Sequence, residues 1–127
     1  MLTTSRIVTL ERQAFGKTGE DLAVDELERR GYAISARRYR TKHGEIDIVA
    51  RDGETIVFVE VKARTTAEFG SAAEAVTRQK QRKLVSMAVD YLTRNEIRDV
   101  PCRFDVVAID GAGESAAITV YPNAFDA

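Results

Sequence analysis

Three charged residues lie within or beside two apolar, β-branched stretches of the sequence. Asp47 interrupts the stretch 46–50, and Glu60 and Lys62 lie at the end of the stretch 56–61. Side chains two positions apart on a strand point the same way, so Glu60 and Lys62 share one face. Carboxylates and an ammonium group on one face can hold a divalent metal ion and act on a phosphodiester. This set is the candidate site.

The two stretches are joined by Asp52-Gly53, a dipeptide that favours a two-residue hairpin turn. A turn centred there pairs Asp47 with Phe58 and Glu45 with Glu60, and it places Asp47 diagonal to Glu60 at about 7 to 8 Å. Carboxylates this close repel unless a proton or a cation lies between them, and oxygen ligands favour Mg²⁺ or Mn²⁺. Two alternatives stay open, an exposed hairpin with solvated charges and a buried salt-bridge network. A metal site does not explain Glu45 opposite Glu60.

Composition and charge narrow the function classes. With 44% hydrophobic and 31% charged residues, the 127-residue chain is typical of a soluble globular protein, and we expect one domain over 1–127. The net charge of -1 argues against a wholly basic nucleic-acid protein. One cysteine and one histidine exclude an internal disulfide and a Cys/His metal site, which fits the cytoplasm. We find no signal peptide or membrane-spanning stretch and expect no membrane partner.

Helical periodicity predicts a first helix over about 13–30, ended by Gly31. Residues 1–12 carry no strong pattern and are predicted to be either a flexible tail or the start of this helix. The apolar stripe of the helix extends back onto Glu20, so a carboxylate lies on the core-facing line. The first turn of a helix also favours negative charge, which is reason enough for Glu20 taken alone.

The rest of the chain predicts a second helix and further strands. Thr77 is a suitable N-cap for a helix to about Asn95, after a loop over 63–76. Strands are expected from Pro101 to 109 and from 117 to 121, the last closed by Pro122. The order is helix, three strands, helix, two strands. It predicts an α/β or α+β fold with a mixed central sheet of about five strands flanked by helices, in which the strands before and after the second helix are parallel neighbours.

Basic residues gather in two segments, the end of the strand predicted over 32–40 and the first turns of the second helix. Such clusters can bind a nucleic-acid backbone, although a solvated edge is the commoner reason for them. The residues expected to contact phosphates are Arg37, Arg38, Arg40, Lys42, Arg64 and Lys80.

An acidic residue on one strand, an acid-x-lysine on the next and a glutamate on the first helix resemble the PD-(D/E)xK nuclease superfamily. The sequence resembles one family within it more closely, the YraN family of small bacterial proteins predicted to be endonucleases, related to archaeal Holliday junction resolvases. The resemblance covers residues 14–125. The motifs that carry it are Gly16-Lys17-Thr18-Gly19-Glu20, Gly31-Tyr32, Gly44-Glu45-Ile46-Asp47, Phe58-Val59-Glu60-Val61-Lys62-Ala63-Arg64, Phe69-Gly70 and Arg103-Phe104-Asp105-Val106-Val107.

This resemblance implies a restriction-endonuclease-like or resolvase-like core and an Mg²⁺-dependent endonuclease that cuts DNA, branched or otherwise structured. Asp47 and Glu60 would bind the metal together with the carbonyl of Val61. Glu20 would add a ligand or orient a water, and Lys62 would position the attacking water. Two-fold relatives imply a homodimer. The alternatives are a catalytically silent nucleic-acid-binding or assembly module on the same fold and a nuclease that acts on RNA.

Overall fold

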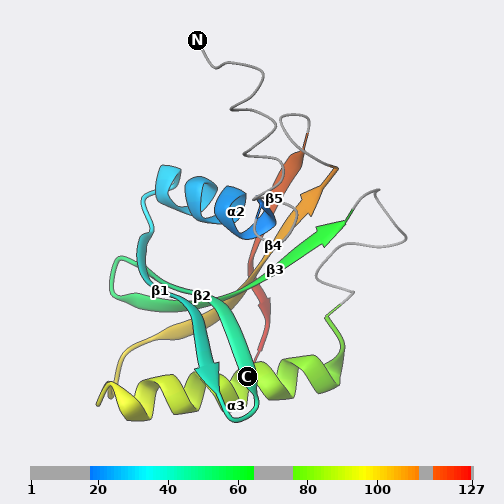
Figure 1. The fold of residues 1–127 in the computed structure, drawn as a ribbon. Coiled ribbons are helices and arrows are strands. Elements are labelled where there is room, and N and C mark those ends of the chain that lie inside the picture. Colours follow the sequence, from blue (N-terminus) through cyan, green and yellow to red (C-terminus); the bar gives the residue numbers. More distant parts are fainter. Residues whose placement is uncertain (1–17, 65–75, 112–115, 127) are drawn as a thin grey trace.

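The computed structural model describes residues 18–64, 76–111 and 116–126, whose strands form one five-stranded sheet (Figure 1). In chain order the elements are α2 (Thr18–Arg29), β1 (Ala33–Thr41), β2 (Gly44–Asp52), β3 (Thr55–Arg64), α3 (Arg78–Arg94), β4 (Cys102–Asp110) and β5 (Ala117–Phe125). The strand order is β1-β2-β3-β4-β5, with β3 and β4 parallel and the other neighbours antiparallel. The mixed sheet, the element order and the parallel crossover predicted from the sequence are confirmed.

The two helices cover opposite faces of the sheet (Figure 1). Each face of the sheet has its own hydrophobic core, and alternate residues of β3 point into one or the other. Phe58 packs in the cluster beneath α3, and Val59 packs in the cluster beneath α2. Leu27 of α2 and Met87 of α3 are almost fully buried in these clusters. No helix of the described ranges is long and apolar enough to cross a membrane.

Both helices end as the sequence predicts. Gly31, with φ +93°, follows the last turn of α2 and provides the left-handed residue that terminates it. Residues 1–17, which hold the predicted tail and the predicted start of this helix, lie outside the described ranges, as do residues 65–75 of the loop predicted over 63–76. The loop prediction was wrong for residues 63 and 64, which belong to β3. Asn95 is the C-cap of α3, and Thr77 is its N-cap, whose hydroxyl accepts the Lys80 amide at 3.2 Å.

The N-cap of α3 gives a first prediction. Thr77→Ala should lower the free energy of unfolding by about 1 kcal/mol, because the amide of Lys80 loses its acceptor at the start of the helix. Urea unfolding followed by circular dichroism measures the change. Thr93→Ala, which removes an exposed hydroxyl near the other end of α3, is the control and should stay within about 0.5 kcal/mol. Equal losses in the two variants would contradict the capping role.

The hairpin turn between β2 and β3 lies one residue later than predicted. Asp52 pairs with Thr55, so Gly53 and Glu54 form the turn, and Gly53 has φ +61°. The predicted register was therefore wrong by two residues: Ala50 pairs with Val57, not with Thr55. An even shift leaves the side chains of the paired segments, from Ile48 to Asp52 and from Thr55 to Val59, on their predicted faces.

The last strand is longer than predicted. Pro122 does not close β5, which continues to Phe125 on the edge of the sheet. The pairing of β4 with β5 shifts between Phe104 and Val106, and Asn123, with φ +51°, lies in this irregular part. Because proline has no amide hydrogen to donate, an edge strand at an irregularity is where it is tolerated inside a sheet.

A charged network ties the sheet together at the start of β4. The side chain of Asp105 is fully buried, and it accepts hydrogen bonds from the Arg103 Nε at 3.0 Å and from the Asn123 amide at 2.9 Å. The Tyr32 hydroxyl lies 3.3 Å from Asp105 and also contacts Arg103, whose guanidinium lies over the Tyr32 ring. Arg103 further pairs with Asp52 at 3.0 Å. One buried carboxylate therefore links the end of α2, β4 and β5.

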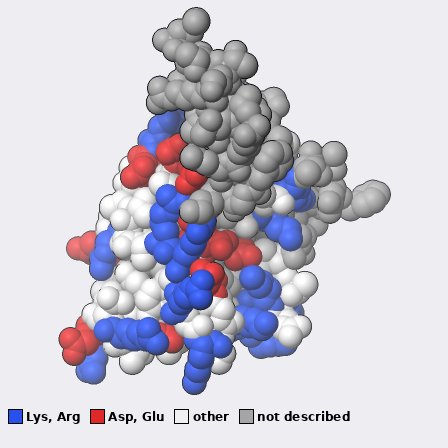
Figure 2. Space-filling view, in the orientation of Figure 1, with Lys and Arg blue, Asp and Glu red and all other residues white. Residues whose placement is uncertain are grey.

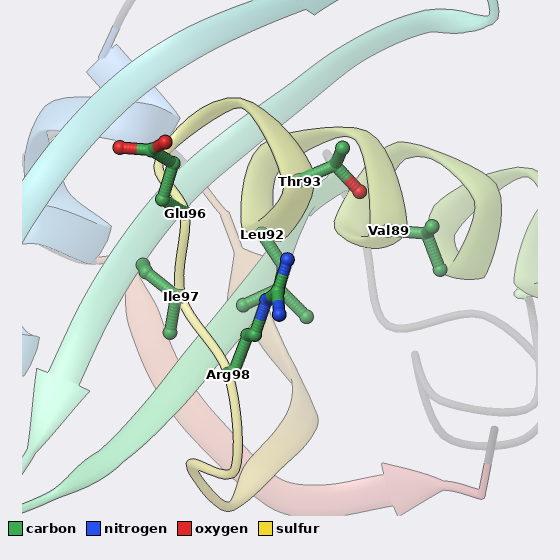
Figure 3. Close-up of a pocket in the computed structure, with 6 residues that line it drawn as sticks. All are labelled: Val89, Leu92, Thr93, Glu96, Ile97 and Arg98. Atoms are coloured by element: carbon green, nitrogen blue, oxygen red, sulfur yellow. The ribbon is translucent and has the colours of Figure 1, made fainter.

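A pocket of about 330 Å³ lies beside the C-terminal half of α3 (Figure 3). Val89, Leu92 and Ile97 provide its apolar part, and Val89 is 56% exposed. None of the residues predicted to act on phosphodiesters lines this pocket.

Candidate functional site

The carboxylates of Asp47 and Glu60 meet where β2 separates from β3. The pairing of these strands ends at Ile48 and Val59, so Asp47 and Glu60 are the next residues along each strand. The Val61 amide, beyond the end of the ladder, donates to the Asp47 Oδ2 at 2.8 Å. Asp47 thus lies level with Glu60, and the expected diagonal placement and the pairing of Glu45 with Glu60 were wrong.

Asp47 also lies at a change of face in β2. Ile46 packs in the cluster beneath α3 and Ile48 in the cluster beneath α2, although residues two apart on a regular strand share a face. On the neighbouring strand, Arg38 has φ +51° between Arg37, which is level with Ile48, and Tyr39, which is level with Ile46. The two strands therefore change face together, and Asp47 lies at this point.

Burial and mutual repulsion raise the pKa values of both carboxylates. The Glu60 side chain is 12% exposed. Burial, followed by the charge of Asp47, raises the pKa of Glu60 to about 7. Burial also raises the pKa of Asp47, and the Val61 amide opposes that shift. A cation bound between the two carboxylates would relieve their repulsion.

The raised pKa of Glu60 predicts how stability depends on pH. Between its ordinary pKa of 4.5 and about 7, the folded protein holds a proton that the unfolded chain has released. The free energy of unfolding without metal should therefore fall across this window as the pH rises, by on the order of 2–3 kcal/mol. Urea unfolding at several pH values in EDTA measures the trend.

Glu60→Gln isolates this contribution, because glutamine cannot ionise and leaves the rest of the site in place. The difference in stability between Glu60→Gln and the native protein should grow in favour of the variant from pH 4.5 to 7. A constant difference over that range would show that the pKa of Glu60 is not raised.

Lys80 of α3 provides a cation beside the Asp47–Glu60 pair. Its Nζ lies 3.4 Å from the Glu60 Oε2, and its charge lowers the pKa values of both Glu60 and Asp47. The sequence assigned Lys80 to phosphate contacts. Its position could have been inferred from spacing, because Lys80 precedes the buried Leu84 by four residues and so faces the sheet.

Glu20, in the first turn of α2, lies near the pair but is held by arginines. Its Oε1 accepts from the Arg37 Nε at 2.8 Å and its Oε2 from the Arg38 Nε at 3.0 Å. Arg37 also contacts Asp21 at 2.6 Å. The charge of Glu20 still reaches Asp47, whose pKa it helps to raise. In the described parts of the chain, no three acidic, histidine or cysteine side chains converge as a metal site.

The other basic residues differ in their exposure and in their acidic partners. Arg64, with a side chain 7% exposed, pairs with Asp110 at 2.7 Å. Arg40 and Lys42 are exposed at the end of β1, and Lys62 is half-buried at the end of β3. Among the described residues, Lys62 makes no ion pair. Figure 2 shows basic side chains around an acidic patch on one face of the molecule.

Comparisons with known proteins place the chain in a family. A family model described as "Uncharacterised protein family UPF0102" matches residues 19–109. The chain is similar to a UPF0102 protein of Geobacter metallireducens, 46% identical over 94% of this chain and 98% of that protein. A Ralstonia pickettii protein of the same name is 54% identical over 78% of this chain and 82% of its own length. A Myxococcus xanthus UPF0102 protein is 38% identical over 96% of this chain and 97% of its own length. The protein belongs to the UPF0102 family, which is the YraN family that its motifs resemble.

Proposed function

We propose that this protein hydrolyses phosphodiester bonds in DNA, with Mg²⁺ held by Asp47 and Glu60. The observation that carries the proposal is the largely buried pair of carboxylates, which lie level with each other where the pairing of β2 with β3 ends. Burying two such groups side by side, with Lys80 as their cationic neighbour, costs free energy that an apolar pair would not cost. A function that needs both carboxylates is therefore the better explanation of the pair.

The donor set fits Mg²⁺. This ion prefers oxygen ligands, keeps several waters and is commonly bound by one or two carboxylates together with substrate phosphates. Asp47 and Glu60 meet that requirement without a third acidic residue, and the Val61 carbonyl stays a predicted ligand from the family resemblance. Bound there, Mg²⁺ supplies Lewis-acid stabilisation of the charge that develops on the phosphoryl oxygens.

The remaining roles belong to cationic side chains. Lys62 is on the same strand as Glu60, two residues further on, so it shares its face and can hold the attacking water or offset charge in the transition state. Arg40 and Lys42 are exposed and can contact the phosphate backbone. Arg64 is left out of this set because its side chain is 7% exposed and paired with Asp110.

A cleavage assay tests the proposal. Purified protein is given labelled branched, flapped and single-stranded DNA, and single-stranded RNA of the same sequence, with Mg²⁺, Mn²⁺ or EDTA. We expect cleavage of DNA that requires the metal and favours branched substrates. Cleavage of RNA alone would retain the site and change the substrate, and no cleavage of any nucleic acid would reject the activity.

Lys62→Gln gives a prediction specific to the role of the ammonium group. Removing one preorganised donor to the transition state should lower the rate constant for cleavage by about 10²–10³-fold, with little change in DNA affinity. Single-turnover kinetics measures the rate, and fluorescence anisotropy measures the affinity. A loss of affinity equal to the loss of rate would instead make Lys62 a binding residue.

A second candidate is a nucleic-acid-binding module without cleavage activity. One observation favours it: Glu60 and Glu20 already have cationic partners in Lys80, Arg37 and Arg38. Calorimetry separates the two functions. Binding of Mn²⁺ that disappears in Asp47→Ala supports the enzyme, whereas DNA binding without any metal binding supports the module.

A further inference from the structure

The acidic residues of the candidate site have the protein's own cations as counterions. Glu60 pairs with Lys80 at 3.4 Å, and Glu20 pairs with Arg37 at 2.8 Å and Arg38 at 3.0 Å. These three cations are also among those that the sequence assigns to phosphates. These cationic side chains can therefore pair with two kinds of anion: the carboxylates of the site and the phosphates of a nucleic-acid backbone.

Exposure shows which partner of each pair is free to move. The side chains of Arg37, Arg38 and Lys80 are 38%, 42% and 44% exposed, whereas those of Glu20 and Glu60 are 14% and 12% exposed. A long, partly exposed basic side chain can turn toward solvent without disturbing the core. The carboxylates, in contrast, are fixed by the packing of α2 and β3. Each ion pair therefore opens by movement of the cation.

The backbone at Arg38 favours this arrangement at a cost. Adjacent strand residues normally point to opposite faces, yet Arg37 and Arg38 both contact Glu20 because Arg38 has φ +51°. A residue with a side chain adopts this conformation only with backbone strain. The strained backbone places two arginines on one carboxylate beside Asp47.

We propose that the protein binds its metal ion and its nucleic acid cooperatively, by exchanging these counterions. When the metal ion joins Asp47 and Glu60, it displaces Lys80. When phosphates take Arg37 and Arg38, the negative charge of Glu20 is left uncompensated beside the same pair and favours the metal ion. The inference rests on the proposed function only in assuming that a divalent ion and a nucleic acid share this site.

The coupling follows from competition between like charges. The metal ion frees Lys80 for phosphates, and phosphates free the charge of Glu20 for the metal ion, so binding of one ligand lowers the cost of binding the other. Thermodynamic linkage requires the effect to be reciprocal, and coupling between two sites of this kind is commonly about 5- to 150-fold. The metal ion should therefore tighten DNA binding by a factor in that range.

Fluorescence anisotropy of a labelled branched DNA measures this factor as the ratio of the dissociation constants in EDTA and in saturating Ca²⁺. We expect a ratio of about 5 to 150 for the native protein. Lys80→Gln and the double variant Arg37→Gln/Arg38→Gln should each reduce the ratio toward 1. The double variant should lose most of its affinity in Ca²⁺ and little in EDTA, where these arginines are occupied by Glu20.

The chain provides matched controls for loss of a paired cation. Arg29 and Arg30 both contact Glu26 on α2, and Arg94 pairs with Asp90 at 2.9 Å on α3. Arg29→Gln/Arg30→Gln and Arg94→Gln remove the same charges from pairs outside the site. Both should keep the native ratio.

Calorimetric titration of Ca²⁺ without DNA gives a second test, in which the proposed exchange and simple damage to the site predict changes of opposite sign in Ca²⁺ affinity. Removal of the competing ammonium in Lys80→Gln should tighten Ca²⁺ binding, whereas mere damage to the site would weaken it. A native ratio of 1, an unchanged ratio in both site variants, or weaker Ca²⁺ binding in Lys80→Gln would overturn the exchange. Coupling without cleavage would retain it and reject the nuclease, and cleavage with a ratio of 1 would do the reverse.

Discussion

Asp47→Asn should lower the rate of Mg²⁺-dependent DNA cleavage by roughly 10³-fold while leaving the protein at least as stable as before. The rate falls because the metal loses one of its two carboxylates, and metal-ion stabilisation of the transition state is worth several kcal/mol, at 1.36 kcal/mol for each factor of ten. Stability is kept because asparagine can still accept the Val61 amide and no longer repels Glu60. Single-turnover cleavage and urea unfolding measure the two effects.

The opposite signs of these effects separate a functional pair from a structural one. If Asp47 and Glu60 were retained as a stabilising network, Asp47→Asn would lower stability and leave the rate to follow the folded fraction. Glu45→Gln is the control, because Glu45 is exposed on the same strand and lies level with Arg40 rather than with Glu60. It should cut DNA within about twofold of the native rate. Cleavage by Asp47→Asn within tenfold of native would place the metal elsewhere.

The fold follows from local signals in the sequence. The apolar runs 46–50 and 56–61 predict β2 and β3, Thr77 and Asn95 bound α3, and Gly31 marks the end of α2. The error in the hairpin, which turns at 53–54, arose because Asp52 and Gly53 both suit a turn, and sequence alone does not decide which pair of residues occupies it. The error did not change the prediction that Asp47 and Glu60 lie on one face of the hairpin, because a register shift of two residues keeps each side chain on the same face.

The candidate site was only partly predictable. Alternation along β3 predicts that Glu60 and Lys62 share a face, but nothing in the sequence predicts that β1 and β2 change face at Arg38 and Asp47. The ion pairs between elements that are distant in the sequence could not be predicted either. Lys80 is twenty residues beyond Glu60 in the chain, and a basic residue carries no sequence signal that separates a phosphate contact from an internal counterion.

Asp105 belongs to one of the sequence motifs, but the sequence does not reveal that it is the centre of a buried hydrogen-bond network. It lies inside an apolar strand, and its partners Tyr32 and Asn123 come from segments far away in the sequence. Only Arg103, two residues earlier on the same strand, is a local partner, and side chains with this spacing share a face. The network therefore reports on assembly of the whole sheet rather than on one element.

Asp105→Ala should lower the free energy of unfolding by about 3–5 kcal/mol. The buried carboxylate satisfies the Arg103 guanidinium and the Asn123 amide, and its removal leaves a partly buried cation and a backbone donor without their main partner. Asp52, at 3.0 Å, compensates only in part because it is 45% exposed. Urea unfolding at neutral pH measures the loss.

Two variants show whether that loss comes from the network. Asp105→Asn keeps an acceptor for the Asn123 amide and removes only the charge, so its loss of stability should be smaller than that of Asp105→Ala. Asp25→Ala, on the exposed side of α2, should change stability by no more than about 0.5 kcal/mol. Asp105 is level with Val59 and lies on the α2 face of the sheet, whereas Glu60, the next residue of β3, points to the other face. Any folded fraction of Asp105→Ala should therefore cleave DNA at the native rate per folded molecule. A lower rate would mean that the two faces of the sheet are coupled.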